Sequence, residues 1–305
     1  MQKKLSITWD GIEDSTGYLF SFAKSLSAVV KNSPYAELAE DIIATSGFAF
    51  RMWVDRELCP SATSIWAFAE QKRWVENGGL VCDYVERMWG EDALEQERRE
   101  QAIGLIRESI GRGIGAVAWD ISGCEWGVIT GFNDEERLLY TLRIDGGQGT
   151  VEYDRLGRLE LPILSVLTVR DRAERTQQEI TDGMLRIARA HLKGEEWCDN
   201  AKGLEAYPAL IAGIREKLSA DSSWNLEYYL GTYAALKQYA LKYFEKYGHT
   251  ALAEKYRVIF GEWMAAFRLK REKDVLLDEV KEEIIAHLQR ACEAESEAAG
   301  LMAQR

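Results

Sequence analysis

The stretch from Gly111 to Val169 constrains the fold most, because it holds most of the strand-like sequence in a chain that is otherwise helical. Short runs rich in Val, Ile, Leu, Thr and Tyr are separated by turn residues, which is typical of strands joined by tight loops. The dipeptides Asn133-Asp134 and Gly146-Gly147 predict hairpin turns, so neighbouring strands should be antiparallel. The strands that we predict are residues 114–121, 125–131, 138–143, 150–153 and 163–169.

The residues before this stretch predict mainly helices. Helical spacing of apolar residues predicts helices over 14–31, 35–44, 62–75 and 92–110. Apolar alternation around Arg51 predicts a short strand or extended segment over 45–54. The run from Gly111 to Gly115 follows a helix and enters a strand, the reverse of the order in a dinucleotide-binding loop. We interpret it as a helix end and a turn.

From Asp171 onward the composition changes to Ala, Glu, Lys, Arg and Leu without strand-like runs. We therefore predict an α+β fold with a domain of helices packed on an antiparallel sheet (1–170), an all-helical domain (171–305) and a cleft between them. The last helix carries a narrow stripe of Val280, Ile284, Leu288 and Cys292, which predicts docking on its own domain or on a second copy. The helices expected in this part are about 172–193, 204–219, 224–246, 250–270 and 272–299.

The charge and cysteine patterns exclude several classes of function. A net charge of -12 and a pI near 5.0 disfavour nucleic acid and anionic membrane surfaces as partners, because both attract basic proteins. The sequence has no run of about 18 apolar residues and no signal-peptide pattern, so we expect a cytoplasmic protein. Its five cysteines are widely spaced without a CxxC pair, which predicts reduced thiols, no zinc site and no metal or other cofactor.

Two residues, Cys59 and Glu125, are candidates for a catalytic or binding role. Cys59 precedes a predicted helix, where the helix dipole and free N–H groups favour a thiolate and can stabilise an oxyanion. The alternative is a cysteine packed as a small apolar residue. Glu125 lies on a predicted strand beside Trp126, so it either faces a polar cleft or pairs with an arginine such as Arg51.

The run from Glu125 to Asn133, which is preceded by the segment from Gly111 to Val117, resembles a strand of papain-like cysteine peptidases of the bacteriocin-processing C39 type. It is also similar to the N-terminal domain family of the butirosin biosynthesis acyltransferase BtrH. This resemblance covers roughly residues 45–170. It implies that Cys59 is the nucleophile and that Asp145 is the acid that orients the base.

The position of the base, a histidine in active peptidases of this type, is Glu125 here. A carboxylate beside a thiol raises the pKa of the thiol, whereas an imidazole can take and return its proton. The first 190 residues contain no histidine; His191, His249 and His287 all follow. The resemblance therefore implies a catalytic scaffold whose working residue does not suit thiol-protease chemistry.

Three functions follow as hypotheses. The first is a non-proteolytic domain that binds a small molecule or peptide in the predicted cleft. The second is acyl or amide transfer of the BtrH type, with Cys59 as nucleophile. The third is a structural protein that forms a homodimer through its C-terminal helix. In the first hypothesis the cleft is lined by Arg51, Glu125, Trp126, Tyr229 and Tyr233, although a tyrosine stripe of this kind is also typical of a core.

Overall fold

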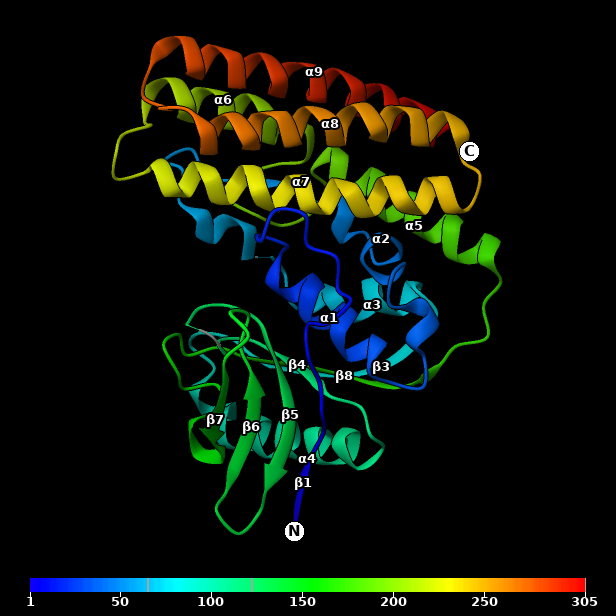
Figure 1. Cartoon of the computed structure of the whole chain (residues 1–305). Helices are drawn as coiled ribbons and strands as arrows, with labels where there is room; N and C mark the ends of the chain where they lie inside the picture. Colours follow the sequence, from blue (N-terminus) through cyan, green and yellow to red (C-terminus); the bar gives the residue numbers. More distant parts are fainter. Residues whose placement is uncertain (65, 122, 305) are drawn as a thin grey trace. The chain divides into compact units, whose positions relative to one another are not determined.

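The computed structural model describes residues 1–64, 66–121 and 123–304, and it confirms an α+β chain with an antiparallel sheet and an all-helical C-terminal part (Figure 1). The chain forms two compact units, each built from three segments. The sheet unit comprises Met1–Glu13, Ser21–Ile42 and Phe68–Ile180. The helical unit comprises Asp14–Phe20, Ile43–Ala67 and Thr181–Arg305.

The sheet unit is built on a seven-stranded antiparallel sheet in the order β3-β8-β4-β5-β6-β7, with β1 paired to β5. The five predicted strands (β4 to β8) and both hairpin connections are confirmed, whereas β1 and β3 were not predicted. The bounds are β1 Gln2–Lys4, β3 Leu80–Arg87, β4 Ala116–Ala118, β5 Gly127–Asn133, β6 Leu138–Leu142, β7 Gln148–Glu152 and β8 Leu164–Arg172.

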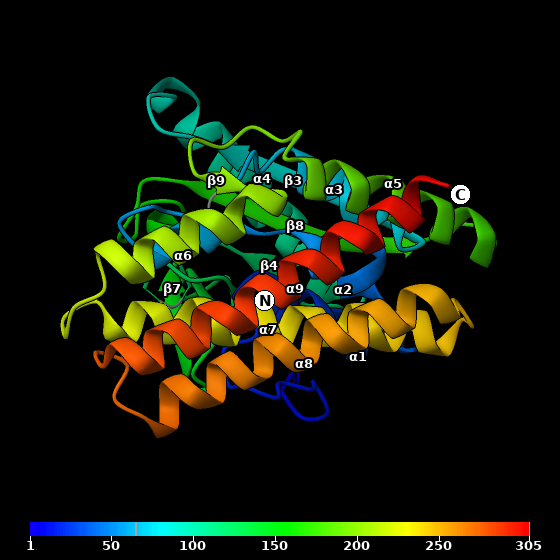
Figure 2. The same cartoon turned by 90° about the horizontal axis from the view of Figure 1, so that it is seen from above.

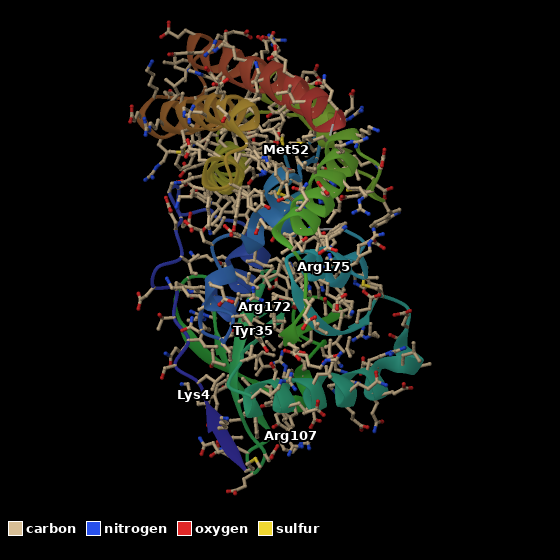
Figure 3. The ribbon with its side chains drawn as sticks, turned by 90° about the vertical axis from the view of Figure 1, so that its right-hand side faces the viewer. Lys4, Tyr35, Met52, Arg107, Arg172 and Arg175 are labelled. Atoms are coloured by element: carbon tan, nitrogen blue, oxygen red, sulfur yellow. The ribbon has the colours of Figure 1, made fainter. Side chains whose placement is uncertain are left out.

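All seven residues of β5 are buried because this central strand is covered by helices. Helix α4 (Glu95–Gly111) packs on one face, where Ala102, Ile106 and Ile110 share a core with Ile129 and Phe132. Helix α1 (Ser21–Lys31) packs against β4 and β5. Figure 3 marks α4 with Arg107 and β1 with Lys4, and these two elements contact each other.

A β-bulge interrupts β5 at Thr130. Ile129 pairs with Thr141 and Gly131 with Tyr140, so Thr130 is an extra residue on the β5 side. A bulge of this kind turns a side chain away from the regular alternation of a strand. Gly131 is required next to it, because a Cβ atom there would lie 2.4 Å from the carbonyl oxygen of Lys3 on β1.

The helical unit contains most of α5 and all of α6 to α9, and all five predicted helices are confirmed. Figure 2 shows α7, α8 and α9 as long helices lying side by side. The unit also holds a two-stranded sheet of β2 (Trp53–Val54) and β9 (Ala201–Lys202). The helix bounds are α5 Gln177–Lys193, α6 Ala206–Glu216, α7 Ser223–Lys246, α8 Thr250–Glu272 and α9 Asp278–Ala303.

A buried ion pair and the hydrogen bonds around it join four helices of the C-terminal part. Lys237 Nζ on α7 lies 2.6 Å from Glu295 Oε1 on α9, and neither side chain is exposed to solvent. The Tyr207 hydroxyl on α6 and the Tyr256 hydroxyl on α8 also donate to Glu295, at 2.7 and 3.1 Å. Trp263 on α8 donates to the Tyr207 hydroxyl at 3.0 Å. One carboxylate therefore connects α6, α7, α8 and α9.

The apolar stripe of α9 is covered within the chain. Val280, Ile284 and Leu288 are buried, and α9 packs against α8 and α6. The sequence predicted that this stripe docks either on its own domain or on a second copy of the chain. In the structure it packs on helices of its own chain. Among the described residues, none of the helices combines the length and apolar character needed to span a bilayer.

Three predicted helices near the N-terminus are shorter than expected. The helix predicted at 14–31 begins only at Ser21, and the one predicted at 35–44 is split into η1 Ala36–Leu38 and α2 Ile42–Thr45. The prediction of one helix over 62–75 was wrong: the chain forms a 3-10 helix, η3 Pro60–Ser64, and then α3 Glu70–Asn77. A bond from the Thr63 hydroxyl to the Pro60 carbonyl, at 3.0 Å, favours the tight turn over an α-helix.

The segment 45–54, predicted to be a short strand or an extended segment, is a strand only at Trp53–Val54. A 3-10 helix, η2 Phe48–Phe50, precedes this strand. The buried side chains Phe48 and Phe50 pack inward from this short helix, which explains why apolar spacing alone was ambiguous.

Candidate functional site

Cys59 belongs to the helical unit, whereas Glu125 and Asp145 belong to the sheet unit. The Cys59 thiol is exposed, and its Sγ lies 3.0 Å from the Ser61 hydroxyl. The following helix is the five-residue η3, which supplies far less dipole than a long α-helix. Among the described residues, no histidine forms a hydrogen bond with this thiol.

Glu125 is held by Ser21, the first residue of α1. The Ser21 hydroxyl donates to Glu125 Oε2 and accepts the backbone N–H of Trp126 at 3.3 Å. The Trp126 ring is fully buried in the core rather than open to a ligand. Its T-shaped ring contacts are with Phe22 at 4.9 Å, Phe68 at 5.1 Å and Trp119 at 5.2 Å.

Arg51 is buried in the helical unit inside a cage of aromatic rings. Its Nη2 donates to the Thr63 carbonyl, while Nε and Nη1 have no hydrogen-bond partner among the described residues. Burial lowers the pKa of this guanidinium to about 10, so it remains charged at neutral pH. The rings that face the cation are Trp53 at 4.5 Å, Trp66 at 4.6 Å, Phe20 at 4.8 Å and Phe48 at 5.6 Å, and they replace the expected carboxylate.

Tyr229 and Tyr233 are buried on α7, and the backbone already occupies their hydroxyls. Tyr229 accepts the N–H of Asp55 at 3.1 Å and donates to the carbonyl of Cys59. Tyr233 accepts the N–H of Trp53 at 2.8 Å and donates to the carbonyl of the same residue. Burial raises the pKa of both hydroxyls. The two tyrosines therefore fasten the segment 53–59 to α7.

Asp145 closes the turn between β6 and β7. Its Oδ1 accepts the N–H of Gly147 at 2.8 Å, and its Oδ2 accepts from Arg143 Nη2, also at 2.8 Å. These two hydrogen bonds lower the pKa of this exposed carboxyl. Its hydrogen-bond partners among the described residues, Arg143 and Gly147, belong to the same hairpin, so Asp145 stabilises this turn.

A group that the sequence did not predict lies at the start of β5, where Asp120, Cys124 and Glu160 place their ligand atoms within 4.8 Å of one another. Asp120 accepts the N–H groups of Cys124 at 2.8 Å and of Leu161 at 2.9 Å. Partial burial and the nearby carboxylates raise the pKa of Cys124, so its thiol stays protonated at neutral pH and is a poor nucleophile. Two carboxylates and one thiol are chemically able to ligate a divalent ion such as zinc.

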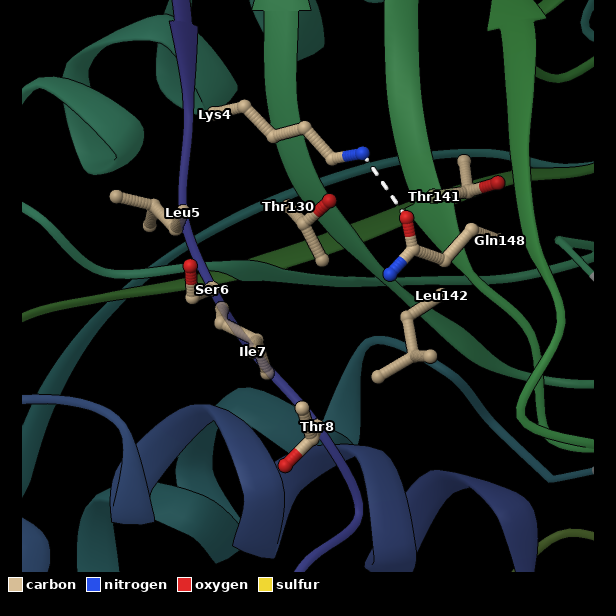
Figure 4. A pocket seen from close by; sticks show the side chains of 9 residues that line it. All are labelled: Lys4, Leu5, Ser6, Ile7, Thr8, Thr130, Thr141, Leu142 and Gln148. Carbon is tan, nitrogen blue, oxygen red and sulfur yellow. Dashed lines mark hydrogen bonds between the residues drawn. The ribbon is translucent and has the colours of Figure 1, made fainter.

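A pocket of about 450 Å³ lies in the sheet unit, where residues 4–8 leave β1 and pass along β5, β6 and β7 (Figure 4). Its size is within the range typical of sites for small molecules. Segments more than a hundred residues apart in the sequence form its walls. The lining residues are Lys4, Leu5, Ser6, Ile7, Thr8, Thr130, Thr141, Leu142 and Gln148.

Thr130 contributes a hydroxyl to this pocket. The bulge turns its side chain out of the regular strand pattern, and only 3% of the residue is exposed. Its backbone carbonyl accepts the N–H of Leu5 at 2.8 Å, but its hydroxyl bonds to none of the described residues. Figure 4 shows the Thr130 side chain on β5 between Lys4 and Gln148. Because this hydroxyl lines the pocket and has no partner among the described residues, it is available to a bound molecule.

A second hollow, of about 760 Å³, lies in the helical unit beside α6 and is mostly charged. Its charges are largely paired within the protein: Lys217 Nζ lies 2.8 Å from a carboxylate oxygen of Glu57. Lys202 Nζ donates to the carbonyls of Glu196 and Cys198 at 2.7 and 3.0 Å. Arg56, Glu205 and Glu216 also line this hollow and form no ion pair with a described residue.

The sequence matches no model of a known protein family and no curated protein. The fold itself defines the class, an α+β protein with a seven-stranded antiparallel sheet and an all-helical C-terminal part.

Proposed function

We propose that this protein binds a small polar molecule without transforming it, and that the pocket of the sheet unit is the binding site. The observation that carries this proposal is the Thr130 hydroxyl, which lines the pocket on a residue that is only 3% exposed and has no hydrogen-bond partner among the described residues. A hydroxyl can donate one hydrogen bond and accept two, so all of its capacity is available to a molecule in the pocket.

The residues proposed for catalysis support binding rather than reaction. Among the described residues, the Cys59 thiol has a hydrogen bond with the Ser61 hydroxyl, and Asp145 has hydrogen bonds with Arg143 and Gly147 of its own hairpin. Glu125 accepts a hydrogen bond from Ser21. As part of the proposal, the sheet unit is a papain-like scaffold of non-proteolytic type. The carboxylate of Glu125 at the position of the base and its contact with Ser21 support this relationship.

The test is a thermal-shift and calorimetric screen of small polar compounds against the wild type, Thr130→Val and Thr150→Val. Valine keeps the β-branched shape and removes the hydroxyl. Thr150 is a matched control because it lies exposed on β7 of the same sheet and outside the pocket lining.

We expect Thr130→Val to fold with at least wild-type stability and to bind the hits about 5-fold to 10-fold more weakly, which is the loss of one hydrogen bond of roughly 1 kcal/mol. Thr150→Val should bind them as the wild type does. If the hits bind Thr130→Val with unchanged affinity, or if none of the compounds binds, the pocket is not the site.

A further inference from the structure

The pocket of the sheet unit carries a single positive charge and no negative charge among its nine lining residues. Lys4 is the cation, and it forms no ion pair with a described carboxylate. The nearest acid along the chain, Asp10, accepts a hydrogen bond from Thr8 at 2.9 Å and is not part of the lining. In a chain with a net charge of -12, this pocket is a local site for an anion.

The Lys4 ammonium is held over the pocket although its residue is exposed. It donates to Gln148 Oε1 at 3.0 Å and lies 5.1 Å from the centre of the Tyr140 ring. The Tyr140 hydroxyl in turn accepts from Gln2 Nε2 at 2.6 Å. The pairing of β1 with β5 at Gly131 sets the position of the lysine backbone. These contacts already restrict the Lys4 side chain, so it loses less conformational entropy when a ligand binds than a free surface lysine would.

Gln148 presents a donor to the pocket as a consequence of this contact. Its carbonyl oxygen points to Lys4, as the dashed line in Figure 4 shows, so its NH₂ group points the other way, toward Leu142. With the Thr130 hydroxyl and the remaining ammonium protons, the pocket offers three kinds of donor. A carboxylate has about four lone-pair positions to accept them.

The charge and shape of the pocket narrow the class of anion. One lysine balances a single negative charge, whereas a phosphate dianion calls for more cationic groups or for the bidentate fork of an arginine. Ile7 and Leu142 supply an apolar wall for a short hydrocarbon group. We propose that the pocket binds a small organic monocarboxylate, with Lys4, Gln148 and Thr130 around the carboxylate. This inference rests on the proposed function of the same pocket.

The experiment measures the affinity of isobutyrate, isobutyramide and inorganic phosphate for the full chain by NMR titration. Isobutyramide has nearly the shape of isobutyrate without its charge. The variants are Lys4→Met and the matched control Lys3→Met. Lys3 is the neighbouring residue on β1, and its ammonium donates to the Gly111 carbonyl at 2.8 Å, away from the pocket lining.

We expect isobutyrate to bind the wild type at least 10-fold more tightly than isobutyramide, because charge-assisted hydrogen bonds are about twice as strong as neutral ones. Lys4→Met should remove this preference, and Lys3→Met should keep it. Equal binding of the amide and the carboxylate in the pocket overturns the anion assignment and leaves the proposed function standing. Tighter binding of phosphate, or an equal effect of Lys3→Met, also overturns the assignment. If no probe shifts any pocket resonance, both the assignment and the proposed function fail.

Discussion

Replacing Lys237 with methionine should destabilise the helical unit strongly, because it leaves the Glu295 carboxylate buried without its counter-ion. The Lys237 and Glu295 side chains have no exposed surface, and their charged atoms lie 2.6 Å apart. Removing one partner of a buried ion pair typically costs about 3–5 kcal/mol. That is a large part of the roughly 5–15 kcal/mol that stabilises an ordinary domain.

Two more variants, Glu295→Met and the double variant Lys237→Met/Glu295→Met, distinguish the effect of the unpaired charge from the effect of the lost hydrogen bonds. Glu295→Met leaves the ammonium unpaired and also removes the acceptor of the Tyr207 and Tyr256 hydroxyls, so its cost should exceed that of Lys237→Met. The double variant removes both charges together. It should lose only about 1–3 kcal/mol, mainly for the Tyr256 hydroxyl, because Tyr207 still accepts from Trp263.

Urea denaturation gives the three free energies of unfolding, and hydrogen exchange of peptides from α7 and α9 reports the helical unit by itself. The second readout is needed because a chain with two compact units can unfold in more than one transition. A loss below about 1 kcal/mol for Lys237→Met, or a double variant whose loss equals the sum of the two single losses, would refute the reasoning.

Two further predictions concern the sheet unit. Gly131→Ala should lower the free energy of unfolding by about 1–3 kcal/mol and speed hydrogen exchange in β1, because the new Cβ would lie 2.4 Å from the Lys3 carbonyl oxygen. The control is Gly104→Ala in α4, where nothing lies within 4 Å of the new Cβ, and it should be neutral or stabilising. Hydrogen bonds from Arg158 and Arg99 lower the pKa of Glu95 despite partial burial. The ionised Glu95 carboxylate therefore stabilises the fold above about pH 4.5. This stabilisation is lost as the pH falls through the lowered pKa of Glu95 in the folded protein. Glu95→Gln should cost about 1 kcal/mol at pH 7, and urea titrations across pH should show the difference vanish in acid; a difference that persists there would contradict the assignment.

Most of the regular structure could be predicted from local patterns. The strands β4 to β8 and the helices α4 to α9 follow the apolar periodicity and the turn residues that surround them. β1 could not be predicted, because Gln2–Lys4 is wholly exposed and polar and becomes a strand only through its pairing with β5. β3 was ambiguous because Tyr84 breaks its alternation of buried and partly buried residues.

The candidate site was harder to predict because it depends on contacts between segments that are far apart in the sequence. The resemblance to a peptidase family grouped Cys59, Glu125 and Asp145 into one site, but each of them has hydrogen-bond partners of its own. The pocket depends on Lys4 and Thr130, which are brought together by pairing between strands far apart in the sequence. The one sequence signal was Gly131, since a glycine inside a strand often marks a bulge or a close approach of backbone.

The most direct test of the central claim is an NMR titration of the threonine γ-methyl groups and the glutamine side-chain amides with isobutyrate. The account predicts saturable shifts of the Thr130 methyl and the Gln148 amide, with the exposed Thr150 methyl unchanged. Shifts that concentrate on residues outside the pocket, or no saturable shift at Thr130, would contradict it.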